Sequence, residues 1–147
     1  MIRFSRDLVE QSFQAHYKRG VVVRFNMECD DPNRPRRYKY GVVLNSDCSE
    51  PEALLAISTS RIDKFASGRS DRDILRLPEG TYPWTTEDTV VDLRELRAEK
   101  VDDLKLLCER QEMRFEGPLK AEHIAELNEK LRASRLLEIR LKKRVVG

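Results

Sequence analysis

The chain has few of the residues and motifs that metal centres, disulfides and membrane spans require. Its three cysteines, Cys29, Cys48 and Cys108, form no CxxC pair, which argues against both a disulfide framework and a zinc site. The two histidines, His16 and His123, add no ligand spacing. No run approaches the ~18 apolar residues of a membrane span, and the first residues do not resemble a signal peptide. We therefore expect a cytoplasmic protein without a metal or other cofactor.

Sequence signatures of several enzyme classes are also absent. There is no phosphate-binding GxxxxGK[ST] loop, no GxSxG nucleophile elbow and no HExxH zinc motif. The balance of 28 basic against 26 acidic residues gives a net charge of only +2. Nucleic-acid binding therefore cannot be argued from overall charge, and only a local basic patch could support it.

The length of 147 residues and the hydrophobic content of 39% fit one domain with a single core. Hydrophobic periodicity predicts a helix over 5–18, strands at 21–25, 40–45, 52–59 and 73–77, a β-branched segment at 86–96 and a helix from 118 onward. Residues 105–115 fit either a strand or a helix. We predict one α+β domain, built on a small, strongly bent sheet or barrel at 20–118, with an N-terminal helical extension at 1–19 and a C-terminal helix and basic tail at 119–147.

A basic and aromatic stretch is the strongest functional signal in the sequence. It follows a long polar loop and contains Arg34, Arg36, Arg37, Tyr38, Lys39 and Tyr40. Guanidinium groups bind phosphate through paired hydrogen bonds, and tyrosine rings stack on unpaired bases. The stretch therefore favours RNA as a partner. The alternative is a solvated loop whose tyrosines pack on the rim of the core.

Thr59 ends a predicted strand and is followed by Arg61 and Lys64. A hydroxyl group beside two cations could hold a phosphate oxygen. The commoner role of such a threonine is to cap the turn that follows it.

Asp92 and Arg94 share one face of a predicted strand and could form a surface ion pair, which would contribute little stability. Trp84, the single tryptophan, is either a core residue or a contact for a partner, and the core role is commoner.

Five segments, taken in order over residues 19–133, resemble the MazF/PemK/Kid family of bacterial toxin endoribonucleases. They are RGVVVRF, YKYGVVLNSD, ALLAISTSR, TTEDTVVDLRELRAEKVDDL and PLKAEHIAELNEKL. The resemblance implies a small SH3-like β-barrel of the MazF/Kid/CcdB type that forms a two-fold homodimer. It also implies the toxin of a type II toxin–antitoxin system, which cleaves single-stranded RNA without metal and is bound by a cognate antitoxin protein. In that chemistry the 2′-hydroxyl of the RNA attacks the adjacent phosphate.

The family's active-site threonine or serine falls on Thr59, and its key arginine falls on Lys39. Lysine keeps the charge of that arginine but lacks its two-pronged geometry, which Arg37 could supply from two residues upstream. The resemblance thus gives Lys39, Arg37 and Thr59 as catalytic residues, and no metal ligand. Expected RNA contacts are Arg34, Arg36, Tyr38, Tyr40, Arg61, Lys64, Asp92 and Arg94.

Three departures from the family pattern support an alternative. Lys39 replaces an arginine, and Asp92 and Arg94 reverse the order of the family's Arg-x-Asp pair. The acidic or histidine base that some members carry in the first loop has no match at the aligned position, where Glu28, Asp30 and Asp31 are only nearby. The alternative is a catalytically impaired barrel that binds nucleic acid or a protein partner without cleaving it.

Overall fold

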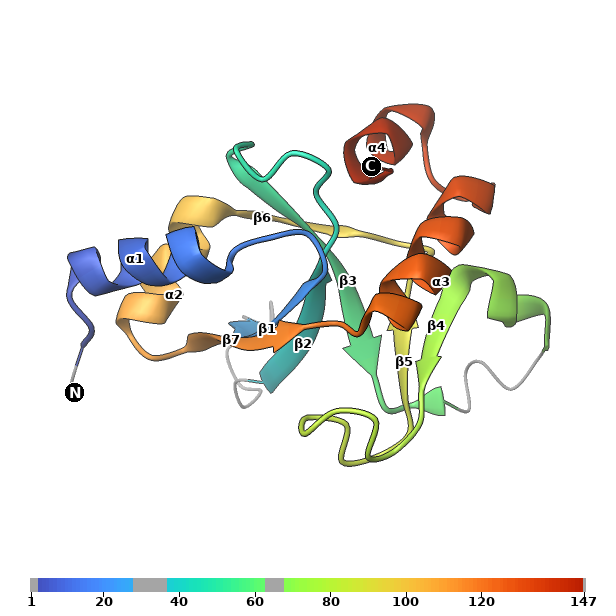
Figure 1. Ribbon diagram of the computed structural model, residues 1–147, viewed down its shortest axis with the longest axis horizontal. Helices are drawn as coiled ribbons and strands as arrows, with labels where there is room; N and C mark the ends of the chain where they lie inside the picture. Colours follow the sequence, from blue (N-terminus) through green and yellow to red (C-terminus); the bar gives the residue numbers. More distant parts are fainter. Residues whose placement is uncertain (1–2, 28–36, 63–67, 147) are drawn as a thin grey trace.

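The computed structural model describes residues 3–27, 37–62 and 68–146, which form an α+β fold (Figure 1). Its helices are α1 (Arg6–His16), the 3₁₀ helix η2 (Gly68–Asp73), α2 (Val101–Glu109), α3 (Ala121–Ala133) and α4 (Ile139–Val145). Its strands are β1 (Val21–Met27), β2 (Arg37–Val43), β3 (Glu52–Thr59), β4 (Ile74–Leu77), β5 (Thr89–Asp92), β6 (Arg97–Lys100) and β7 (Met113–Pro118).

The seven strands pair antiparallel in the order β4-β5-β3-β2-β1-β7, with β6 pairing on β3. Strand β3 changes its neighbours along its length: its first half pairs with β6, its middle with β2, and Ser58 and Thr59 pair with β5. In Figure 1 it runs through the centre of the molecule between these partners. The outermost strands β4 and β7 do not pair with each other in the described residues, so the bent sheet is not closed into a barrel.

Both faces of the central strands are buried, which explains why their sequences are continuous apolar runs rather than alternating ones. Successive side chains of a strand point to opposite faces. Accordingly Val22, Val42 and Leu54 belong to one core cluster, while their neighbours Val23 and Val43 belong to another.

A different pair of helices covers each cluster (Figure 1). Helices α1 and α2 contribute Val9, Phe13, Leu104 and Cys108 to the cluster around Val23. Helix α3 and the α4 region contribute Leu127, Leu131, Leu137 and Val145 to the cluster around Val22. The sheet is therefore held between two helical layers.

The predicted N-terminal helix and the first four predicted strands are confirmed. The hydroxyl of Ser5 caps α1 by accepting a hydrogen bond from the Leu8 amide at 3.2 Å. The 86–96 segment holds only the short strand β5. The ambiguous segment 105–115 divides into the end of α2 and the start of β7, and the chain reverses at Gln111, whose φ is +59°. Short apolar windows of this kind fit both helical and strand periods.

The C-terminal region differs from the expected single helix with a basic tail. Helix α3 ends at Ala133, and the Ser134 hydroxyl accepts hydrogen bonds from the amides of Leu136 and Leu137, both at 3.3 Å. A second helix, α4, then follows, and its Val145 is fully buried. The tail is therefore part of the core rather than an appendage.

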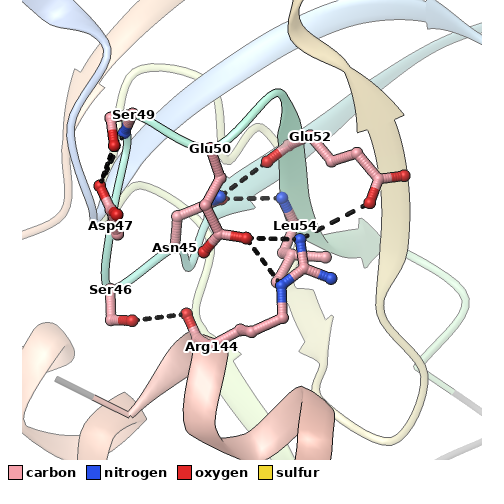
Figure 2. Close-up of polar contacts among 8 residues, drawn as sticks. All are labelled: Asn45, Ser46, Asp47, Ser49, Glu50, Glu52, Leu54 and Arg144. Atoms are coloured by element: carbon pink, nitrogen blue, oxygen red, sulfur yellow. Dashed lines mark hydrogen bonds and ion pairs between the residues drawn. The ribbon is translucent and has the colours of Figure 1, made fainter.

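Polar contacts fasten α4 to the loop between β2 and β3 (Figure 2). Arg144 bonds Glu50 through Nε and Nη2, both at 2.8 Å, and its carbonyl accepts from the Ser46 amide at 2.7 Å. Within the loop, the buried amide of Asn45 donates to the Glu52 carbonyl at 2.7 Å and accepts from the Leu54 amide at 2.8 Å. These bonds fix the ends of β2 and β3 relative to α4.

Candidate functional site

A pocket of about 170 Å³ lies where β2 and β3 separate. The two strands pair as far as Gly41 and Ile57. Two residues further along that register, Lys39 would lie opposite Thr59. The pairing of β2 with β3 stops before that point, whereas on its other edge β3 still pairs with β5 through Thr59 and Val90, and Lys39 and Thr59 both line the pocket. The divergence of the strands thus gives two side chains access to a common space.

Polar and aromatic side chains line the pocket together. The polar residues are Lys39, Ser58, Thr59, Ser60, Thr86, Glu87 and Thr89, and the aromatic ones are Tyr38, Tyr40 and Trp84. They come from β2, from β3 and the residues after it, from β5, and from the loop that precedes β5. One cation, one carboxylate and several hydroxyls therefore surround an aromatic surface.

Two of the aromatic lining residues, Tyr40 and Trp84, belong to a stack of three rings. The ring centroids of Tyr40 and Trp84 lie 4.9 Å apart at 22°, and those of Trp84 and Tyr82 lie 5.5 Å apart at 17°. Trp84 is 8% exposed and belongs to the core cluster, which confirms the core role, and it is also one of the pocket's lining residues. Tyr40 packs against the same cluster, as the alternative interpretation of the tyrosines held.

The far ring of the stack is tied to the start of α3. The Tyr82 phenol accepts a hydrogen bond from the Lys120 amide at 2.7 Å and bonds His123 Nδ1 at 2.6 Å. Burial raises the pKa of Tyr82, so the phenol stays protonated at neutral pH, and the tautomer of His123 decides which of the two groups donates in their hydrogen bond. The position of the aromatic stack is therefore fixed from the C-terminal helical layer.

Thr59 acts as a turn cap in this structure. Its Oγ1 accepts a hydrogen bond from the Arg61 amide at 3.1 Å, which confirms the commoner of its two predicted roles. A hydroxyl group has one proton to donate in addition to the lone pairs through which it accepts. The cap therefore leaves the donor function of Thr59 available to a ligand in the pocket.

Asp92 and Arg94 form the predicted surface ion pair. Arg94 Nε and Nη2 each bond one carboxylate oxygen of Asp92 at 3.0 Å, and the Arg94 amide bonds Oδ1 at 2.9 Å. The hydrogen bond to Asp92 raises the pKa of Arg94 and so keeps it charged. The pair lies at the end of β5 remote from Thr89 and does not line the pocket.

The pocket unites four of the predicted site residues, which are Tyr38, Lys39, Tyr40 and Thr59. Arg61 is exposed just beyond Thr59 and is not part of the lining. Arg37 begins β2, and its side chain lies outside the described part of the structure. The predicted contacts Arg34, Arg36 and Lys64 lie outside the described residues altogether.

Glu87 is the lining residue of greatest chemical interest that the sequence did not single out. Among the residues that line this pocket, Glu87 carries the only carboxylate. The backbone carbonyl of Glu87 accepts a hydrogen bond from Thr89 Oγ1 at 2.9 Å. The segment TTED, residues 85–88, reads as an ordinary polar loop. Only the pairing of β5 with β3 brings it beside Lys39 and Thr59.

No protein-family model matches the chain, and no curated protein matches it either. Within the ranges that the structure describes, no group of three His, Cys, Asp or Glu side chains could hold a metal ion. No helix among the described residues has the length and apolar character needed to cross a bilayer.

Proposed function

We propose that this chain is the toxin component of a type II toxin–antitoxin system, a metal-independent endoribonuclease that cleaves single-stranded RNA. The observation that supports this best is the pocket itself, in which Lys39, Thr59 and Glu87 surround an aromatic surface. In RNA cleavage a cation and a hydroxyl donor can stabilise the charge that develops on the phosphate, a carboxylate can take up a proton, and rings can hold a base. The resemblance of five ordered segments to the MazF/PemK/Kid family points to the same activity.

In this reaction the 2′-oxygen bonds to phosphorus and the bond from phosphorus to the 5′-oxygen breaks. The products are a 2′,3′-cyclic phosphate and a free 5′-hydroxyl, so one proton leaves the 2′-hydroxyl and one reaches the 5′-oxygen. Glu87 would accept the first proton, and solvent water would supply the second. Lys39 would stabilise the charge that develops on the non-bridging oxygens, with Arg37 as a second cation, and Thr59 would donate a hydrogen bond to one of those oxygens.

The aromatic residues would hold the nucleotide next to the cleaved bond. Tyr38 is 40% exposed and so presents a ring on which a base can stack. Tyr40 is covered by Trp84 and would instead form the floor beneath the sugar and phosphate. A nucleotide held in this way has its 2′-oxygen close to the adjacent phosphorus. Such positioning can supply a large part of the rate acceleration.

The assembly follows from the same proposal. We regard the bent, open sheet as a form of the small SH3-like barrel of this family, and we propose a homodimer that binds a cognate antitoxin in the cytoplasm. Arg34, Arg36, Arg61 and Lys64 would extend the RNA path beyond the pocket.

The test is a cleavage assay on long RNA of mixed sequence in the presence of EDTA. We expect cleavage products with cyclic phosphate ends and a strong loss of cleavage in the double variant Lys39→Ala/Arg37→Ala. The matched control is Arg140→Ala/Lys143→Ala, which removes two exposed charges from α4. If the pocket variant loses less than a few-fold of its cleavage activity, the site assignment is wrong.

A barrel that binds RNA or a protein without cleavage is the second candidate. It is favoured by the Thr59 hydroxyl already capping a turn and by the Asp92–Arg94 pair, whose groups bond each other away from the pocket. It predicts salt-dependent RNA binding with no cleavage of any sequence. Absence of RNA affinity at low salt would leave a protein partner.

A further inference from the structure

A row of basic and aromatic side chains crosses β2, β1 and β7 beside the pocket. Arg24 of β1 is the register partner of Tyr40 on β2 and of Arg114 on β7. Register partners in an antiparallel sheet project from the same face, with close Cβ atoms. The guanidinium carbon of Arg24 lies 3.8 Å from the centroid of the Tyr38 ring. We call Arg24, Tyr38 and Arg114 the β-face platform.

In the free protein, the two positive charges of the platform repel each other, which costs free energy. Arg24 and Arg114 are directly opposed across two strands, and like charges in that position repel. The Tyr38 ring offsets part of this repulsion at Arg24. Glu116 offsets part at Arg114 through a 2.6 Å bond to Nε. A phosphate placed between the two guanidinium groups would relieve the repulsion directly.

The platform is accessible to a ligand. The side chain of Arg114 is 66% exposed, Tyr38 is 40% exposed and Arg24 is half-buried. The bond to Glu116 engages only the Nε edge of Arg114, and a guanidinium group carries five N–H donors. Arg114 can therefore hold Glu116 and a phosphate oxygen together.

Tyr38 connects the platform to the pocket. It lines the pocket and also carries Arg24 on its ring. Strands in a sheet lie about 4.8 Å apart, so β7 is about 10 Å from β2. A single strand that contacts Tyr38 at the pocket can therefore continue over β1 to β7 along the face that carries Arg24 and Arg114.

We propose that the β-face platform binds the RNA segment adjacent to the cleaved bond, with Arg24 and Arg114 on its phosphates and Tyr38 under one base. This inference rests on the proposed function, because it takes single-stranded RNA as the ligand. It adds two phosphate contacts that lie outside the basic stretch at residues 34–40.

The test uses single-stranded RNA with 2′-O-methyl groups, in which the attacking hydroxyl is blocked, so that binding is measured without cleavage. Affinity is measured by fluorescence anisotropy for a dinucleotide and for a strand of about 12 nucleotides. We expect Arg24→Ala/Arg114→Ala to weaken binding of the longer strand about tenfold. The slope of log affinity against log salt should fall by about 1.4, and binding of the dinucleotide should not change.

Two matched controls distinguish the platform from a general charge effect. Arg140→Ala/Lys143→Ala removes the same charge from α4, which packs at the other end of β1, where Arg19 donates to the Val145 carbonyl. It should leave both affinities unchanged. Tyr38→Phe should bind like the parent protein and Tyr38→Ala about tenfold more weakly, because stacking needs the ring alone. Thermal melts verify that each variant is folded.

Equal losses in the platform variant and the α4 control, or no loss in the platform variant, would overturn the inference. The outcome is independent of the cleavage assay. A protein that never cuts RNA but binds long strands through Arg24 and Arg114 would retain the platform and lose the nuclease. If the protein cuts RNA but its binding is insensitive to both substitutions, the nuclease proposal stands and the platform proposal fails.

Discussion

Replacing Arg144 should loosen the C-terminal helix by an amount that the geometry allows us to divide between its partners. The guanidinium group bonds Glu50 at 2.8 Å through both Nε and Nη2, and it lies 3.6 Å from Glu52 (Figure 2). The Arg144 carbonyl, which accepts from Ser46, is unaffected by a change of side chain. The substitution Arg144→Ala therefore tests the ion pairs alone.

The expected magnitude follows from distance and exposure. Exposed ion pairs contribute about 0.2–1 kcal/mol, and hydrogen bonds to charged groups about 1.5–3 kcal/mol. The side chains of Arg144 and Glu50 are 33% and 25% exposed, so we expect a coupling free energy of about 1 kcal/mol between them. For Glu52, which is 44% exposed and further away, we expect less than about 0.5 kcal/mol.

The assay is a pair of double-mutant cycles, Arg144→Ala with Glu50→Ala and Arg144→Ala with Glu52→Ala. Unfolding in urea gives the free energies, with Trp84 fluorescence as the signal. The larger coupling should fall in 1 M salt, where the screening length is about 3 Å. Val145→Ala sets the scale, since it empties two methyl groups from a fully buried site and should cost about 2 kcal/mol. Equal coupling to both carboxylates, or coupling insensitive to salt, would refute the reasoning.

Three further predictions concern the pocket. Glu87→Gln should lower the cleavage rate by about 10²–10⁴-fold in single-turnover assays, because an amide cannot accept the proton of the 2′-hydroxyl; an unchanged rate would exclude Glu87 as the base. Lys39→Arg should cleave at least as fast as the parent protein, because the fork adds a second hydrogen bond to the phosphate, and a rate loss above about tenfold would contradict this. Trp84, the single tryptophan and a lining residue, should change its fluorescence when 2′-O-methyl RNA is titrated in; no change at saturation would place the RNA elsewhere.

The elements whose residues are buried on both faces were predictable from the sequence. Runs such as Val21–Val23 and Val42–Leu44 are short, β-branched or aliphatic and bounded by polar residues, so their length and composition favour a buried strand. Helix α1 was predictable because Ser5 supplies a cap and Val9 and Phe13 lie on one face. Helix α4 was not, because its sequence is largely basic and is held by contacts with distant residues.

The site was predictable only in the part that lies on one continuous segment. Tyr38, Lys39 and Tyr40 are neighbours in the sequence, so their composition marks them directly. Glu87 is one of 26 acidic residues and has no local feature that distinguishes it. Its place beside Thr59 depends on the pairing of β5 with β3, on the edge of β3 opposite β2, which is a property of the sheet rather than of any short window.

Close packing at the last pair of β2 and β3 explains why a glycine stands at position 41. Its backbone is paired with Ile57 at the last point where β2 and β3 are together. A Cβ atom there would lie 3.3 Å from Ile57 Cδ1 and 3.4 Å from the Phe25 ring, tighter than ordinary contact. With no side chain at position 41, Ile57 can pack directly against the strand. Two residues further along this register, at Lys39 and Thr59, the strands have separated, and these two residues line the space between them. Close approach and divergence are thus adjacent, and the pocket depends on both.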